Sequence, residues 1–208
     1  MIVGGKKEEL NKLLEELESD RTLPLYGASN LVFGEGNPEA SVMFIGEAPG
    51  FHEDRLSRPF VGRAGQLLDK LLKEISWPRE SVYITNIIKR RPPENRDPLP
   101  DEIFAYKPYL DRQIDVINPK IIAALGRFAM NYFLPEAKIS KDHGAAQYAG
   151  DYLIFPLYHP AAALRSTAVL KELEADFKKL PEILKNPPPK PPPQPKKEEE
   201  VQKQESLF

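Results

Sequence analysis

Three polar side chains and one aromatic ring lie at positions in the sequence that are typical of a catalytic or ligand-binding site. Glu47 directly follows an apolar run, residues 42–45, in a turn that contains two glycines and a proline. Asn86 lies inside a second apolar run, where asparagine is depleted. His159 follows a third such run, just before a proline. Phe60 lies outside any apolar stripe, between a proline and a glycine-rich turn, so its ring could serve as a stacking surface.

Each of these polar residues also has a structural interpretation. Glu47 could cap the next turn, Asn86 could satisfy a buried backbone group, and His159 could be a hydrogen-bonded core residue or a turn former. Polar groups that converge at the carboxyl ends of neighbouring strands, with an aromatic ring nearby, favour a ligand site instead.

Apolar periodicity predicts the elements that would position these residues. We expect strands over residues 42–45, 82–88, 121–125 and 152–157, and helices over residues 6–17, 66–75, 101–117, 127–133 and 169–184. Strands that alternate with helices predict an α/β fold, a three-layer α/β/α sandwich around a four-stranded parallel sheet. The ligand crevice of such a sheet lies outside the carboxyl ends of its strands.

The charge balance gives no overall signature of nucleic-acid binding, because 29 Lys and Arg face 31 Asp and Glu. Basic residues nevertheless gather in the loops where the crevice should open: Arg55, Arg58, Arg63, Lys89, Arg90, Arg91 and Arg96. This placement favours a polyanion over a neutral metabolite. Cysteine is absent, which excludes disulfides, thiolate catalysis and thiolate metal sites.

The two ends of the chain differ in character from its middle. The polar start lacks the core of a signal peptide, and no run reaches the roughly 20 apolar residues that span a bilayer, so we expect a cytosolic protein without membrane contact. Residues 186–195 read NPPPKPPPQP, which favours an extended polyproline spacer. We therefore expect one catalytic domain over residues 1–185 and a Pro-rich tail over residues 186–208.

Five ordered segments carry a further signal: GEAPG, EDRLSRPFVGRAGQLLDKLL, VYITNIIKRRPPENRDPLP, PYLDRQIDVINPKIIAALGRFA and YHPAAALR. From about Pro24 to Arg165, the chain thereby resembles the family 4 uracil-DNA glycosylases of bacteria and archaea. The resemblance implies a monomeric, nucleoid-associated enzyme of base excision repair that acts on uracil-containing DNA. It would flip a deoxyuridine out of the helix and hydrolyse the bond between base and sugar. A catalytically inactive DNA-binding relative is the alternative.

The resemblance also implies a role for each site residue. Phe60 would stack on the everted uracil, and Asn86 would read its Watson–Crick edge. His159 would donate to uracil O2, where negative charge develops as the base leaves. Gly46 and Ala48 would present backbone groups of the GEAPG turn to the base, since glycine allows close approach.

Glu47 has two possible roles under this resemblance. It could position the attacking water and stabilise the cationic sugar, or it could line the pocket near uracil C5 and help to exclude thymine. No lysine stands at a motif position suited to attack the sugar, so we expect direct hydrolysis without a Schiff base. We expect no metal and no cofactor.

Other positions would contact DNA. By resemblance, Leu164 would wedge into the space that the base leaves, and Arg165 would hold a phosphate. The basic residues Arg63, Lys89 and Arg91 complete the expected DNA-binding set.

Family 4 members typically hold a four-iron four-sulfur cluster through four cysteines, and this chain departs from that pattern. The corresponding positions carry Asp20, Leu23, Arg90 and Tyr106, none of which supplies a thiolate. We expect no cluster. The cluster's bracing role could pass to an Asp20–Arg90 ion pair with Leu23 packed on Tyr106, or these positions could simply have drifted.

The last residues resemble a shortened sliding-clamp peptide with Gln204, Leu207 and Phe208 at its key positions. A proline spacer would let the catalytic domain search DNA while it is tethered to the clamp. The alternative is a terminus that happens to carry two apolar residues.

Overall fold

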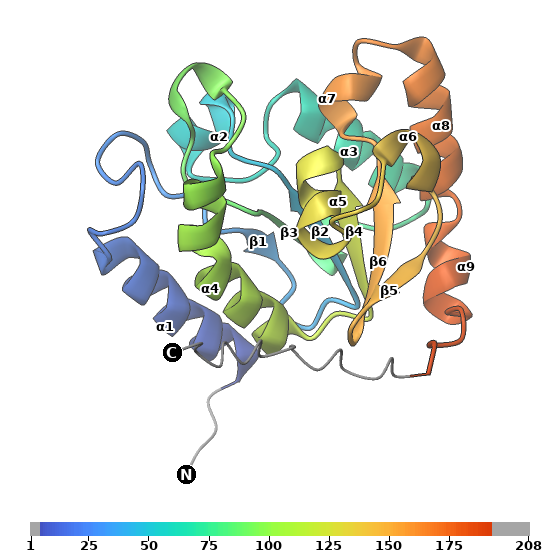
Figure 1. Ribbon diagram of the computed structural model, residues 1–208, viewed down its shortest axis with the longest axis horizontal. Helices are drawn as coiled ribbons and strands as arrows, with labels where there is room; N and C mark the ends of the chain where they lie inside the picture. Colours follow the sequence, from blue (N-terminus) through green and yellow to red (C-terminus); the bar gives the residue numbers. More distant parts are fainter. Residues whose placement is uncertain (1–4, 193–208) are drawn as a thin grey trace, which may run out of the picture.

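The computed structural model describes residues 5–192, and these form one sheet between two layers of helices (Figure 1). The sheet order is β1-β3-β2-β4-β6-β5. The strands are β1 Glu35–Gly36, β2 Val42–Gly46, β3 Tyr83–Asn86, β4 Ile121–Leu125, β5 Gln147–Ala149 and β6 Tyr152–Leu157. The four central strands are mutually parallel, as predicted. Two short antiparallel edge strands, β1 and β5, were not predicted and make the sheet six-stranded and mixed.

The predicted helices occur in the expected order, with a correction to the last one, and three short helices were not predicted. The helices are α1 Lys6–Ser19, α2 Phe51–Leu56, α3 Arg63–Glu74, α4 Pro100–Ile117, α5 Arg127–Phe133, α6 Ile139–Asp142, α7 Pro160–Ala163, α8 Thr167–Phe177 and α9 Leu180–Lys185. Those not predicted are α2, α6 and α7. The single helix expected over residues 169–184 is wrong, because α8 and α9 are separate. Pro181 has no N–H to donate to the carbonyl of Phe177, so a continuous helix would lose that bond.

Two hydrophobic cores, one on each face of the sheet, confirm the three-layer sandwich. Successive β2 residues alternate between them: Met43 and Ile45 lie in the core shared with α1, α4 and α5. Val42 and Phe44 lie in the core shared with α3, α8 and α9. Figure 1 shows α1 and α4 on one side of the sheet and α8 and α9 on the other. Within residues 5–192, no helix is long and apolar enough to span a membrane.

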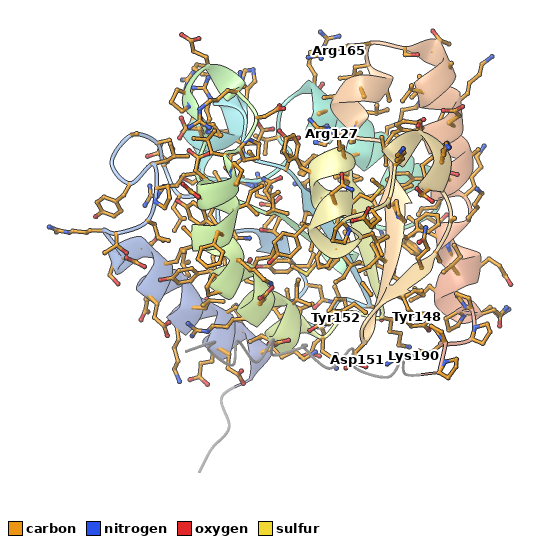
Figure 2. All side chains as sticks on the ribbon, viewed as in Figure 1. Arg127, Tyr148, Asp151, Tyr152, Arg165 and Lys190 are labelled. Carbon is orange, nitrogen blue, oxygen red and sulfur yellow. The ribbon has the colours of Figure 1, made fainter. Side chains whose placement is uncertain are left out.

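The start of the tail lies against the end of the sheet opposite the carboxyl ends of the parallel strands. The Tyr148 hydroxyl donates to the carbonyl of Pro188 at 3.2 Å, and Lys190 pairs with Asp151. Figure 2 shows Tyr148, Asp151 and Lys190 together, far from Arg165 at the other end of the molecule. The clamp-peptide residues Gln204, Leu207 and Phe208 lie outside the described residues, and the division at residue 185 stays a prediction.

Candidate active site

A cavity of about 360 Å³ opens at the carboxyl ends of the parallel strands. Its walls bring together the four residues singled out from the sequence: Glu47, Phe60, Asn86 and His159. Ala48 also lines it, in the turn after β2. The elements explain this convergence, because Glu47 follows β2, Asn86 ends β3 and His159 follows β6. Parallel neighbouring strands deliver the residues that follow them to one edge of the sheet.

Phe60 reaches the cavity from the loop between α2 and α3, in a backbone conformation that is rare for an aromatic residue. Its φ of 50° lies in the left-handed region. The Glu53 carboxylate stabilises this loop by accepting the backbone N–H groups of Val61 at 2.9 Å and Gly62 at 2.8 Å. On the other side, a Cβ at Gly65 would lie only 1.8 Å from the Phe60 carbonyl oxygen. The loop conformation therefore requires glycine at this position of α3.

Asn86 presents an acceptor without a partner. The side chain is 1% exposed, and its Oδ1 makes no hydrogen bond within the described residues. A Cβ at Gly46 would lie 2.5 Å from both this Oδ1 and Phe60 Cζ, so the amide and the ring share the space above the Gly46 backbone. An unpaired buried acceptor costs roughly 1–3 kcal/mol, which a ligand N–H would recover.

His159 is held as a neutral ring with a defined tautomer. Burial lowers its pKa to about 4, with a smaller contribution from the nearby Arg165 cation. Its Nδ1 accepts the Ala161 N–H at 3.1 Å, which leaves the ring proton on Nε2. The ring lies beside Phe60, with centroids 5.6 Å apart. His159 is thus a neutral hydrogen-bond donor at ordinary pH.

Glu47 titrates near neutrality. Burial raises its pKa to about 7, the nearby Asp97 raises it further, and Arg127 opposes the shift. Arg127, at the start of α5, pairs with Asp97 at 3.2 Å, and Figure 2 shows it near the carboxyl ends of the strands. A carboxyl with this pKa can accept a proton from water at neutral pH.

Several basic and apolar groups surround the cavity. Arg165 lines it directly and Leu164 beside it is 41% exposed. Arg91 lies over the ring of Phe51, with its guanidinium 5.3 Å from the ring centroid. Arg63 is exposed at the first residue of α3. These positions are compatible with the expected DNA contacts.

Lys89 is different, and the expectation that it contacts DNA is wrong. The residue is 0% exposed, and its ammonium donates to three oxygens inside the protein. A phosphate could reach it only if the core opened. The sequence places it in a basic run. Two of its partners, Thr85 and Asn86, are close in the sequence, but the third, Gln113, comes from α4, which a local pattern does not reveal.

The predicted Asp20–Arg90 ion pair is also wrong. Asp20 accepts hydrogen bonds from Thr22 and, at 2.7 Å, from the hydroxyl of Tyr109. The Arg90 guanidinium instead donates to the Ser29 carbonyl and lies 5.0 Å from the ring centroid of Tyr26. Asp20 and Arg90 therefore each bond to other groups and not to one another.

The other two positions that carry cluster cysteines in family 4 members do help to join the segment after α1 to α4. Leu23 and Tyr106 lie in one hydrophobic core, and the Tyr106 hydroxyl donates to the Pro24 carbonyl at 2.7 Å. The segment after α1 is therefore joined to α4 by two phenol hydroxyls, those of Tyr106 and Tyr109. An iron–sulfur cluster requires thiolates, so a carboxylate, an aliphatic chain, a guanidinium and a phenol do not fit one.

Some residues of the site were missed from the sequence. Glu53 lines the cavity and holds the Phe60 loop, and Asp97 faces Glu47. Phe51, 47% exposed between Arg55 and Arg91, adds an aromatic surface at the rim. Neither the short helix α2, which carries Phe51 and Glu53, nor the loop with Asp97 gives a periodic signal, so only the folded backbone reveals these roles.

Comparison with known proteins places the chain in a family. The model of the uracil DNA glycosylase superfamily matches residues 33–185. The chain is 47% identical over 192 residues to the type-4 uracil-DNA glycosylase of Sulfurisphaera tokodaii, covering 86% of this chain and 87% of the relative. It is 49% identical over 169 residues to that of Saccharolobus solfataricus, covering 76% and 78%. The type-4 enzyme of Archaeoglobus fulgidus is 41% identical over 186 residues, covering 85% and 94%. The chain therefore belongs to the uracil DNA glycosylase superfamily, and within it to the type-4 family, as a member without cysteine.

Proposed function

We propose that this protein removes uracil from DNA by everting a deoxyuridine into the cavity and hydrolysing its N-glycosidic bond, which leaves an abasic site. One observation carries the proposal: the unpaired Oδ1 of Asn86 shares one cavity with the Phe60 ring and the His159 donor. A pocket with an aromatic wall and a buried acceptor that has no partner within residues 5–192 suits a flat base that carries an N–H.

The amide of Asn86 would set the choice of base. Uracil presents an N3–H donor beside the O4 acceptor, which matches the acceptor and donor of one fixed amide. Cytosine presents the opposite pattern, an N3 acceptor beside an N4 donor, and would leave buried groups unpaired. Phe60 would stack on the base and replace part of the stacking lost from the helix.

His159 and Glu47, two titratable groups of the cavity, would carry out the cleavage of the bond between base and sugar. As the bond from C1′ to N1 breaks, its electron pair stays with the base, and negative charge develops on uracil O2. The neutral His159 Nε2–H donates to that oxygen and stabilises the charge more in the transition state than in the substrate. A water attacks C1′ and gives its proton to the Glu47 carboxylate.

The rim of the cavity suits a DNA strand. We propose that Leu164 enters the gap left by the everted base and that Arg165 binds a neighbouring phosphate. Arg91 and Arg63 would bind further phosphates, with Phe51 as an additional apolar contact. We further propose that the enzyme works as a monomer and that the tail residues after 192 bind a sliding clamp.

The test is an oligonucleotide assay. The protein is incubated with matched strands that contain either uracil or thymine, and alkali then cleaves any abasic site. We expect cleavage only of the uracil strand, and we expect Asn86→Asp to lower the rate by about 10²-fold or more, since the carboxylate cannot donate to O4. Asn37→Asp, which retains the acceptor for the Glu39 N–H outside the cavity, is the matched control.

The alternative is an inactive DNA-binding relative. That protein would retain uracil DNA in a gel-shift experiment but give no alkali-labile site at any enzyme concentration. The neutral His159 donor and the near-neutral pKa of Glu47 favour the active enzyme, because a binding module needs neither.

A further inference from the structure

Lys89 is the most deeply buried charged group outside the site already described. Its side chain is 0% exposed, and burial lowers its pKa well below the ordinary value. No carboxylate of residues 5–192 forms an ion pair with it. Burying a lysine without a countercharge is expensive, so its partners need to explain its presence.

Three acceptors surround the Lys89 ammonium. Its Nζ lies 2.6 Å from Thr85 Oγ1, 2.8 Å from the Asn86 carbonyl oxygen and 2.5 Å from Gln113 Oε1. The carbonyl of Phe33 fixes the direction of two of these bonds. It accepts from the Thr85 hydroxyl at 2.7 Å and from Gln113 Nε2 at 3.1 Å, so both groups turn their acceptors toward Lys89. An ammonium with three N–H donors matches this arrangement.

One of these acceptors belongs to Asn86, whose side-chain Oδ1 has no partner within residues 5–192. Asn86 is also the last residue of β3, where the ladder to β2 ends with the Gly46–Asn86 pair. The next ladder contact is the Ile87 N–H, which donates to the Gly46 carbonyl at 2.9 Å. Lys89 donates to the carbonyl oxygen of the same peptide group, between Asn86 and Ile87.

We propose that Lys89 is a positioning residue, which holds the Asn86 backbone so that its amide meets the base in the transition state. This inference rests on the proposed function of the cavity. An apolar side chain at residue 89 would leave the Asn86 carbonyl and two further buried acceptors unpaired. The end of β3 would then relax, and the amide would lose its fixed direction.

The expected effect concerns the departing base. An Asn86 amide that donates to uracil O4 stabilises the negative charge that develops there. When that donor is misplaced, the reaction depends more on the intrinsic leaving ability of the base. A 5-fluorouracil base leaves more readily, because fluorine withdraws electrons, so it should suffer less from the loss of Lys89.

The experiment compares single-turnover excision of uracil and of 5-fluorouracil from otherwise identical oligonucleotides. The wild-type enzyme is measured first, and failure to excise uracil would refute the proposed function instead of this inference. For Lys89→Met we expect the single-turnover rate constant for uracil to fall about 10-fold or more, with little change in the enzyme concentration that gives half of the maximal rate. We expect the ratio of 5-fluorouracil to uracil rates to rise by about fivefold or more.

Gln113→Met is the matched control. It removes one buried acceptor of the same ammonium and should destabilise the fold similarly, but it leaves the Lys89–Asn86 bond in place. We expect its ratio of rates to match the wild type. Thermal unfolding of both variants checks that their stability losses are comparable.

A folded Lys89→Met protein with the wild-type ratio of rates would overturn the proposal, as would an equal rise of that ratio in Gln113→Met. If Lys89→Met does not fold, Lys89→Gln takes its place, because it retains an N–H donor and should give a smaller rise in the ratio. If neither variant folds, Lys89 serves the fold as a whole and the positioning role is refuted.

Discussion

At the scale of single residues, Glu47 and His159 have opposite protonation behaviour in the same cavity. Burial lowers the pKa of His159 to about 4 and raises that of Glu47 to about 7. The histidine is therefore uncharged across the working range, and in the proposed reaction it would donate a hydrogen bond and not transfer a proton. The carboxyl is the group whose charge changes near neutral pH, so the pH dependence of the reaction should report on Glu47.

Glu47 should control how the rate depends on pH. The base form is the carboxylate, and the raised pKa places its formation near pH 7, so we expect kcat to rise from about pH 6 to about pH 8 and then to level off. Glu47→Gln should abolish this rise and lower kcat by about 10²-fold. Single-turnover excision measured from pH 5.5 to 9 checks both expectations.

The same measurement separates the two roles of Glu47. A residue that only excludes thymine would leave the pH profile of Glu47→Gln parallel to that of the wild type. Such a variant would instead begin to cleave the thymine oligonucleotide. That combination of results would remove Glu47 from the hydrolytic step.

At the scale of elements, the turn between α2 and α3 positions the stacking ring. We expect Gly65→Ala to lower activity by about 10-fold or more, because its Cβ would overlap the Phe60 carbonyl and displace the ring. Gly5→Ala, at the start of α1 where no atom lies within 4 Å, is the control and should be neutral. Excision rates and thermal unfolding are measured together. A folded Gly65→Ala protein with full activity would show that the ring position is not critical.

The stability of the contact between the segment after α1 and helix α4 should depend on the hydroxyl groups of Tyr106 and Tyr109, and not on an ion pair between Asp20 and Arg90. Tyr106→Phe leaves the partly buried Pro24 carbonyl without its donor, so we expect a loss of about 1–2 kcal/mol, or roughly 2–8 °C in Tm. Arg90→Lys should lower the free energy of unfolding by less, because Arg90 forms no ion pair with Asp20. Thermal unfolding of both variants decides, and a larger loss for Arg90→Lys would contradict this account.

The central strands and most of the helices could be predicted because their apolar residues follow a regular period. The edge strands could not, since β1 has two residues and β5 has three half-buried ones. The convergence of Glu47, Asn86 and His159 followed from the parallel sheet alone. Lys89 and Asp20 escaped prediction because their partners, Gln113 and Tyr109, belong to a helix distant in the sequence.

At the scale of the whole molecule, the start of the tail, up to residue 192, and the cavity lie at opposite ends of the sheet. Lys190 and Tyr148 hold the start of the tail there, while Arg165 marks the cavity end (Figure 2). Deleting residues 204–208 should leave excision from a free oligonucleotide unchanged and abolish retention on an immobilised sliding clamp. Equal retention of the truncated and full-length chains would refute clamp binding through this peptide.

The two phenol hydroxyls that join the segment after α1 to α4 have a chemical consequence. They need neither iron nor a reducing compartment to form their bonds. Peroxide cannot break this contact by oxidising a sulfur ligand, and a chelator cannot break it by removing a metal, because two tyrosine hydroxyls form it. The contact between the segment after α1 and α4 therefore forms as part of folding itself, through two hydrogen bonds.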